Sequence, residues 1–218
     1  MKVEFEDSIK NYIKEVRHAV KSGRSFFANK AYPPFIIAEL SANHNGSLSK
    51  AKETMAAAKE SGAHAVKLQT YTPDTMTIDY DGAGFQIKGG LWDGKNLYRL
   101  YQEAHTPWEW HEPIMERAKE LGMLFFSTPF DETAVDFLED LNVPAYKIAS
   151  FEINHVRLLE FVAQTKKPVL VSTGASDKND IRFAIDYLPV SYTHPPSPRD
   201  ATLSGVAGWG WKKKGGGG

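Results

Sequence analysis

The chain has 218 residues, 42% of them hydrophobic, which is enough to bury one large core or two small ones. A formal net charge of -1 and an isoelectric point near 6.7 show no basic bias, so we expect neither nucleic acid nor a membrane surface as a partner. The chain has no cysteine for disulfides or zinc sites and no apolar run near the ~20 residues of a membrane span, so we expect a soluble cytoplasmic protein.

The first segment predicts an amphipathic helix over residues 6–22, because its apolar side chains recur at spacings of three and four residues. These side chains are Ile9, Tyr12, Ile13, Val16 and Val20. We therefore expect residues 1–32 to form a helical extension outside the main fold.

From residue 33 onward, short apolar runs alternate with helical segments. The predicted strands are FIIAEL (35–40), AVKLQT (65–70), MLFFSTPF (123–130), AYKIAS (145–150) and PVLVST (168–173). Helices are predicted at residues 48–62, 109–121, 131–141 and 155–165. Near-continuous apolar strands that alternate with helices indicate a buried parallel sheet, so the predicted class is α/β.

The turns after the strands favour a closed (β/α)8 barrel over an open doubly wound sheet. An open nucleotide-binding sheet usually has a glycine-rich turn after its first strand, whereas the turn SANHNG has one glycine. Every predicted strand ends in polar side chains, and a barrel collects all strand ends around one mouth. We predict a partial TIM barrel over residues 33–188, truncated after about five strands.

Residues 189–218 show neither helical nor strand periodicity and end in a glycine run. We expect them to be a non-native or disordered tail that supplies none of the missing strands. The stretch SYTHPPSPRDATLS resembles a read-through of cloning or sequencing-adapter sequence.

Polar side chains at or just after the strand ends form a candidate site. They are Glu39, Lys67, Gln69, Ser127, Thr128, Lys147, Ser150, Glu152, Ser172 and Thr173. A lysine in an apolar strand is costly to desolvate unless an anion meets it, so two such lysines predict a negatively charged ligand. The alternative is internal ion pairing of the two lysines with the two glutamates. Several hydroxyls are superfluous for ion pairing, however, and suit phosphate oxygens.

The two-residue period of a strand refines this set. Lys67 and Gln69 share one face and can point into the barrel while Val66 and Leu68 face the helices. Lys147 and Ser150 differ in parity, so one of them is expected to lie beyond the regular strand.

Four blocks of the chain, in order and spacing, resemble the barrel domain of the sialic acid synthase family over residues 33–186. They are FIIAELSANHNG, GAHAVKLQTY, FFSTPFDETAVDFLEDLNVPAYKIASFE and KKPVLVSTGAS. This family comprises phosphoenolpyruvate-dependent synthases of nine-carbon sugar acids. The segment LWDGKNLYRLYQEAHTPWEWH (91–111) looks more like pseudaminic acid synthases than N-acetylneuraminate synthases.

The resemblance implies a condensation between phosphoenolpyruvate and an acetamido sugar. The methylene carbon of phosphoenolpyruvate adds to the aldehyde of the open-chain sugar, water attacks C2 of the resulting cation, and phosphate leaves by carbon–oxygen cleavage. A divalent metal, manganese or magnesium, is expected to polarise the aldehyde in a full-length member.

The resemblance also implies roles for single residues. The residues that match phosphoenolpyruvate-binding positions are Lys67, Thr128, Lys147, Ser150 and Ser172. Glu39 and Glu152 match carboxylates near the sugar and the attacking water, which makes them candidates for proton handling. Gln69 is expected beside the metal or sugar, and Asn43 and His44 are expected to line the mouth, with loop capping as an alternative for His44.

Some family features have no match in this chain. The two metal-ligating histidines come from late barrel strands, so no metal ligand is assigned here. The remaining histidines considered are expected on the surface or as caps: His18, His64, His105, His111 and His155. Because the C-terminal antifreeze-like domain is also missing, we expect the chain to be inactive, although a full-length member would be a homodimer.

Two other functions stay open. One is an aldolase-type barrel in which Lys67 or Lys147 forms a Schiff base with a carbonyl substrate. The other is a barrel that binds a phosphorylated ligand without catalysis. Truncation would leave the first and fifth strands as exposed edges, which favours aggregation.

Overall fold

The computed structural model describes residues 35–90, 92–188 and 193–194. Its strands form one parallel sheet in sequential order. They are β1 (Ile37–Glu39), β2 (Ala65–Thr70), β3 (Leu124–Pro129), β4 (Tyr146–Ile148), β5 (Val169–Val171) and β6 (Thr193–His194). Each predicted strand is present; β2 has its predicted bounds, and the other four are shorter than predicted.

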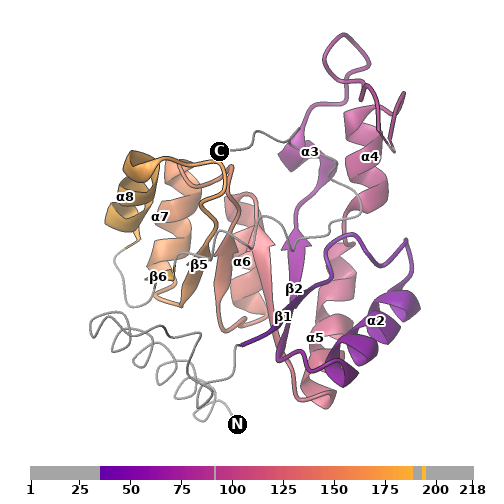
Figure 1. Cartoon of the computed structure of the whole chain (residues 1–218), viewed down its shortest axis with the longest axis vertical. Helices are drawn as coiled ribbons and strands as arrows, with labels where there is room; N and C mark the ends of the chain where they lie inside the picture. The colour runs from indigo at the N-terminus through magenta and orange to yellow at the C-terminus, as the bar shows by residue number, and fades with distance from the viewer. Residues whose placement is uncertain (1–34, 91, 189–192, 195–218) are drawn as a thin grey trace, which may run out of the picture. The chain divides into compact units, whose positions relative to one another are not determined.

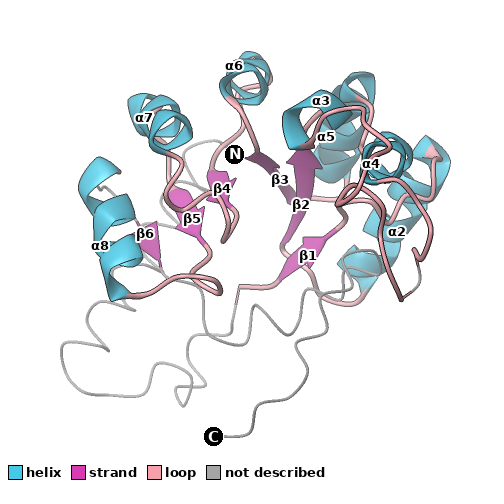
Figure 2. Ribbon diagram, turned by 90° about the horizontal axis from the view of Figure 1, so that it is seen from above, coloured by secondary structure: helices cyan, strands magenta, loops and turns pink. Residues whose placement is uncertain are grey.

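The strands follow a curved arc, and α2, α5, α6, α7 and α8 lie on its outer side (Figure 2). The helices are α2 (Leu48–Glu60), α3 (Pro73–Met76), α4 (Leu97–Ala104), α5 (His111–Glu120), α6 (Glu132–Asp140), α7 (Val156–Gln164) and α8 (Lys178–Tyr187). A 3₁₀ turn, η2 (Trp108–Trp110), runs directly into α5. Sequential parallel strands with helices on the convex side make part of a (β/α) barrel, as predicted.

Local sequence accounts for the helix limits. Asp131 caps α6 by accepting from the backbone N–H of Ala134 at 2.8 Å, and Ser47 caps α2 in the same manner. Gly62 and Gly122 follow α2 and α5 with φ of 94° and 62°, a left-handed conformation that glycine adopts without a Cβ clash. These residues explain why the predicted helix ends lie within a few positions of the observed ones.

The two faces of the sheet differ in character. Toward the helices, Val66, Leu68 and Ile148 are buried in the main hydrophobic core. Toward the inside of the arc, Ala65 and Phe126 belong to a smaller apolar cluster. The prediction that Val66 and Leu68 face the helices is therefore confirmed, and the inner face is left for other chemistry.

His111 lies at the start of α5 and is fully buried, so a surface position is wrong, whereas the capping alternative fits because His111 is the C-cap residue of η2. Its Nδ1 donates to the carbonyl of Pro107 at 3.3 Å, which leaves Nε2 to accept from Thr70 Oγ1 at 2.8 Å. Thr70 in turn contacts Ser127 Oγ at 2.7 Å. These bonds join α5 to β2 and β3 and satisfy three polar side chains inside the core.

The segment between β2 and β3 contains α3 and α4, which stand beyond the carboxyl end of β2 (Figure 1). Asn96 caps α4 by accepting from the Arg99 N–H at 3.1 Å and donates to the Tyr80 carbonyl at 2.8 Å. Leu100 and Tyr101 of α4 are buried. The long stretch that precedes the predicted helix at residues 109–121 is therefore structured and packed at the strand ends.

The described residues depart from the sequence prediction at the end of the sheet. Thr193 and His194 pair in parallel with Val169 and Leu170, although no strand was expected after residue 188. An edge strand exposes unpaired N–H and C=O groups, and these bind a passing backbone whatever its side-chain pattern. The helix predicted at residues 6–22, with the whole 1–32 extension, lies outside the described residues.

Across the described ranges, none of the helices combines the length and apolar character that crossing a bilayer requires.

The buried His111 gives a stability prediction. Burial lowers the pKa of His111 from 6.5 to about 4, because the imidazolium would lose its hydration. The unfolded chain then binds more protons between these values, so the free energy of unfolding should fall by about 3 kcal/mol as pH drops from 6.5 to 4.

Chemical denaturation across this pH range measures that loss in the wild type and in His111→Gln. The variant should be less stable at pH 7.5, because the bond to Pro107 is lost, but its stability should depend less on pH. The exposed His155→Gln serves as the control and should keep the wild-type slope. An unchanged slope in His111→Gln would contradict the assignment.

Candidate active site

On the inner face of the sheet, β1 and β2 bring together a cation and a carboxylate. Glu39 and Lys67 are register partners, and Lys67 Nζ forms an ion pair with Glu39 Oε2. The Lys67 side chain is 11% exposed and the Glu39 side chain 23%. Ser41 Oγ donates to the other carboxylate oxygen, and Lys67 Nζ also donates to Thr128 Oγ1 at 3.3 Å. The alternative of internal ion pairing therefore holds for Lys67.

A second cation lies at the ends of β4 and β5. Lys147 Nζ donates to the Ile148 carbonyl at 3.0 Å and to Ser172 Oγ. Since β4 ends at Ile148, Ser150 lies in the following loop, as the parity argument predicted. Thr173 similarly lies just beyond β5. Each lysine of the site thus meets a hydroxyl from the neighbouring strand.

The register brings Gln69 and Thr128 opposite each other on the inner face. Ser127 has the other parity, lies opposite Leu68, and is held under α5 through Thr70. Ser127 is therefore wrongly placed in the candidate site, because the strand period turns its hydroxyl toward the helices. Thr128 is the hydroxyl of β3 that faces Lys67.

Glu152 lies four residues beyond β4 and is half-buried. Its Oε2 has no hydrogen-bond partner, and its own backbone N–H donates to the Ala149 carbonyl at 3.1 Å. Burial raises the pKa of Glu152, and the nearby charge of Lys147 offsets part of that rise. A carboxyl in this environment can hold a proton at a higher pH than usual, which suits an acid.

Asn43 and His44 lie in the loop after β1 and differ in exposure. Asn43 is exposed, whereas His44 is 1% exposed and packs edge-on against Trp110 with ring centroids 5.3 Å apart. His44 Nδ1 accepts from the Gly46 N–H at 3.1 Å, which is the loop-capping role given as an alternative. Burial lowers the pKa of His44, with a smaller effect of His105 in the same direction.

Buried polar atoms without a partner gather at one edge of the sheet. Within the described ranges they are His44 Nε2, Gln69 Oε1, Tyr71 Oη, Glu152 Oε2 and Ser176 Oγ. All five lie at the end of a strand or in the loop after it. Native cores leave few such groups, so this clustering indicates that a ligand or water meets them at the carboxyl edge.

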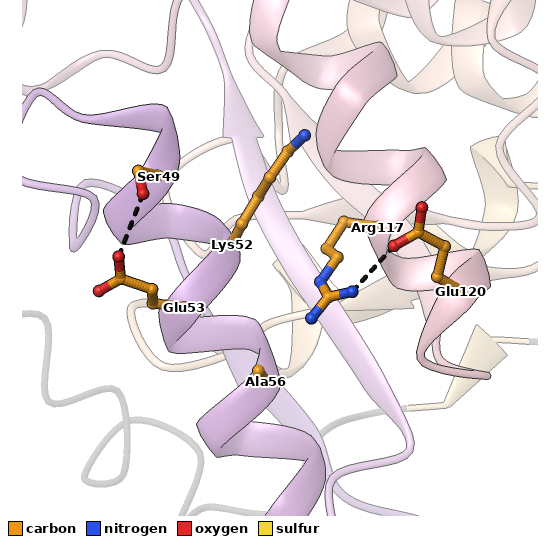
Figure 3. Close-up of a pocket in the computed structure, with 6 residues that line it drawn as sticks. All are labelled: Ser49, Lys52, Glu53, Ala56, Arg117 and Glu120. Carbon is orange, nitrogen blue, oxygen red and sulfur yellow. Dashed lines mark hydrogen bonds and ion pairs between the residues drawn. The ribbon is translucent and has the colours of Figure 1, made fainter.

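A hollow of about 360 Å³ lies elsewhere, between α2 and α5 (Figure 3). Its lining consists of surface residues of these helices: Ser49, Lys52, Glu53, Ala56, Arg117 and Glu120. Contacts within each helix engage several of these side chains, since Arg117 pairs with Glu120 at 2.8 Å and Ser49 donates to Glu53 at 3.1 Å. No strand-end residue contributes to it, so we do not assign the chemistry to this hollow.

In the part of the chain that the structure describes, no three histidine or acidic side chains come close enough to hold a metal ion. Glu39, the inner-face carboxylate of β1, is already engaged by Lys67 and Ser41. These residues alone do not fit a divalent metal.

The inner face therefore carries two ammonium groups, three hydroxyls or amides beside them, and one carboxyl with a raised pKa. This set can bind a small, strongly anionic molecule and exchange a proton with it. The protein family model described as the NeuB family matches residues 54–203.

The chain belongs to the NeuB family.

Relatives of this NeuB family chain include two pseudaminic acid synthases. That of Helicobacter pylori is 52% identical over 153 residues, which cover 70% of this chain and 45% of the relative. That of Campylobacter jejuni is 45% identical over 183 residues, which cover 79% of this chain and 53% of the relative. The similarity expected from residues 91–111 is thus confirmed, and the chain spans about half the length of these relatives.

A solved structure supports the same family. The N-acetylneuraminic acid synthetase of Leptospira borgpetersenii matches with a TM-score of 0.63 at 28% identity. The match covers 79% of this chain and 59% of that chain. The predicted barrel class is therefore confirmed by a family member as well as by the strand order.

Two polar residues of this NeuB family chain escaped the sequence prediction. Ser41 binds Glu39, and only its position two residues after a strand-end glutamate could have suggested it. Tyr71 is buried with an unpaired hydroxyl. The two-residue strand period that relates Lys67 and Gln69, continued by one step, predicts that Tyr71 also faces inward.

The pair of Lys67 and Glu39 predicts a measurable coupling. Removing one charge leaves the other half-buried and unmatched, so Glu39→Gln and Lys67→Met should each lower the free energy of unfolding by about 2 kcal/mol. Urea unfolding of both single variants and the double variant should show the double as less destabilised than the sum. Strict additivity would contradict a direct interaction.

Glu152 predicts a pH dependence of stability opposite to that of His111. Its pKa is raised in the folded state, so the folded chain binds more protons just above the ordinary value of 4.5, and stability is lost as pH rises through this window. Glu152→Gln should therefore melt higher than wild type at pH 7 and equally at pH 4. The exposed Glu160→Gln is the matched control and should change neither melting temperature.

Proposed function

We propose that this chain forms the phosphoenolpyruvate-binding half of the barrel of a pseudaminic-type nonulosonic acid synthase. The observation that carries the proposal is the placement of Lys67 of β2 and Lys147 of β4 on the inner face of one parallel sheet, each beside a hydroxyl of a neighbouring strand. Pseudaminic acid synthases at 45% and 52% identity support the choice within the family.

Phosphoenolpyruvate carries a carboxylate and a phosphate, and the proposed site offers complementary groups for both. Lys67 and Lys147 supply positive charge, while Thr128, Ser172 and Ser150 supply hydroxyl donors near the strand ends. Two cations, one on β2 and one on β4 with β3 between them, can engage the two ends of a short dianion or trianion. The ligand would take over bonds that these lysines now make within the protein.

Glu39 and Glu152 are proposed to handle protons. The raised pKa of Glu152 lets it give a proton to the sugar oxygen that becomes an alkoxide when the new carbon–carbon bond forms. Glu39, which pairs with Lys67 and accepts a hydrogen bond from Ser41, is proposed to accept a proton from the water that attacks C2. Gln69 would offer its unpaired amide oxygen to a sugar hydroxyl.

The whole reaction is proposed only for a longer protein that acts as a homodimer and binds manganese or magnesium. When bound, such an ion would polarise the sugar aldehyde.

An aldolase-type function is less well supported by the contacts of the lysines. A Schiff-base lysine is usually desolvated in an apolar pocket or set beside another cation. Lys67 forms an ion pair with Glu39, and Lys147 donates to a carbonyl and a hydroxyl. Borohydride treatment with pyruvate should therefore leave the chain unlabelled, and a labelled lysine would favour the aldolase.

Calorimetric titration with phosphoenolpyruvate tests the proposed site in the chain itself. Loss of one ammonium should weaken binding by at least tenfold, which is the effect expected from a charge-assisted hydrogen bond of about 1.5–3 kcal/mol. Lys147→Met and Lys67→Met are the test variants. Lys119→Met, at an exposed position on the outer helix α5, should bind as the wild type does.

The titration separates the proposed functions. Binding that depends on both lysines supports a synthase site, and a long gene product that binds but forms no sugar acid would support a non-catalytic phospholigand barrel. Wild-type chain that is folded by circular dichroism yet shows no heat with phosphoenolpyruvate would refute the proposal.

A further inference from the structure

Tyr71 directly follows β2 and continues the inner-face period of Lys67 and Gln69. Gln69 lies opposite Thr128, so the next inner-face pair is Tyr71 and Phe130. Their rings meet edge to face with centroids 5.5 Å apart. We call Tyr71, Phe130 and Tyr101 the Tyr71 cluster, because Tyr101 of α4 also meets Tyr71 edge to face at 5.9 Å.

The Tyr71 cluster contains a buried donor with nothing to donate to. Tyr71 is 2% exposed, and its hydroxyl has no hydrogen-bond partner. The amide oxygen of Gln69, one inner-face position earlier on β2, is also unpaired, as is Glu152 Oε2 in the loop after β4. Folded proteins rarely leave such groups unsatisfied, so three of them at one edge indicate a polar ligand or water at this edge.

Electrostatic neighbours tie the cluster to the proposed site. The negative charge of Glu152 contributes to the raised pKa of Tyr101, and Lys147 acts on Glu152 in turn. The register gives the position directly, because Tyr71 and Phe130 follow the inner-face pair Gln69 and Thr128. The Tyr71 cluster thus borders the strand ends at which we place phosphoenolpyruvate.

We infer that the Tyr71 cluster is an acetamido-binding subsite. The Tyr71 hydroxyl donates to the acetamido carbonyl, and the rings of Tyr101 and Phe130 pack against the acetamido methyl. An acetamido group joins an apolar methyl to a strong acceptor, which matches a buried hydroxyl bordered by aromatic carbons. The inference rests on the proposed function, which supplies an acetamido sugar as the second substrate.

The chemistry of Tyr71 fits a donor and not a base. Burial raises the pKa of Tyr71, with a smaller contribution from Tyr101, so its hydroxyl keeps its proton at all physiological pH values. Its backbone is also held, since Trp108 Nε1 donates to the Tyr71 carbonyl at 3.3 Å. The segment from α3 to η2 therefore positions Tyr71 through Tyr101 and Trp108, which makes it a specificity element.

Tyr71→Phe removes the hydroxyl and keeps the ring. Tyr98→Phe is the matched control on α4, because its hydroxyl donates to Asp74 at 3.1 Å outside the cluster. The probes are N-acetylmannosamine and mannose, which differ in the acetamido group, measured by ligand-observed NMR with and without phosphoenolpyruvate. Wild type and Tyr98→Phe should prefer N-acetylmannosamine, and Tyr71→Phe should reduce this preference by about 3- to 10-fold.

Stability and phosphoenolpyruvate affinity separate a binding role from a packing role. Tyr71→Phe should melt no lower than wild type, because it buries one unsatisfied group fewer, and should bind phosphoenolpyruvate unchanged. Tyr101→Leu is a second variant that should weaken the preference by freeing the Tyr71 ring, with circular dichroism to check its fold.

Each outcome decides a different point. A Tyr71→Phe chain that keeps the full preference, or a wild-type chain that shows none, overturns the subsite and leaves Tyr71 a packing residue. A preference that depends on Tyr71 in a chain that does not bind phosphoenolpyruvate would refute the synthase and leave the subsite standing.

Discussion

The cost of placing ammonium groups on the inner face of a sheet is the constraint on which this structure depends. For Lys67, the contacts with Glu39 and Thr128 offset this cost. For Lys147, a backbone carbonyl and Ser172 offset part of it. These partners satisfy the lysines without an anion, so the site is stable when empty. In the proposed function a multiply charged anion would replace them.

Strand order turns this constraint into a site. Because consecutive parallel strands are neighbours, every strand presents its carboxyl end to the same edge, and every loop after a strand starts there. In the inner apolar cluster, Ala65 precedes Lys67 on β2 and Phe126 lies opposite Lys67, so the polar inner-face positions begin directly beside this cluster. The unpaired buried atoms then collect at that edge, whereas the helix-facing core satisfies even His111.

Periodicity and strand-end chemistry were sufficient to predict the five main strands, the barrel class and the inward placement of Lys67 and Gln69. These two signals do not predict a polar residue correctly where its hydrogen-bond partner lies on a different helix or strand. The sequence pattern predicts Ser127 as a site hydroxyl and His111 as a surface or capping residue, yet the structure joins the two through Thr70. A pattern along one strand shows which face a side chain takes only when its neighbours are clearly apolar, and Ser-Thr at positions 127 and 128 gives no such contrast.

The curvature of the sheet links the site to the length of the relatives. On its inner face Ile37, Leu124 and Leu170 are only partly buried, although they pack on the inner cluster. A closed barrel would cover these side chains and exclude water from the same face, and relatives about twice as long have the residues to do so. Water exclusion lowers the local dielectric constant and strengthens the attraction between two lysines and an anion. The half-barrel thus supplies the charges of the site, and barrel closure would set how strongly they act.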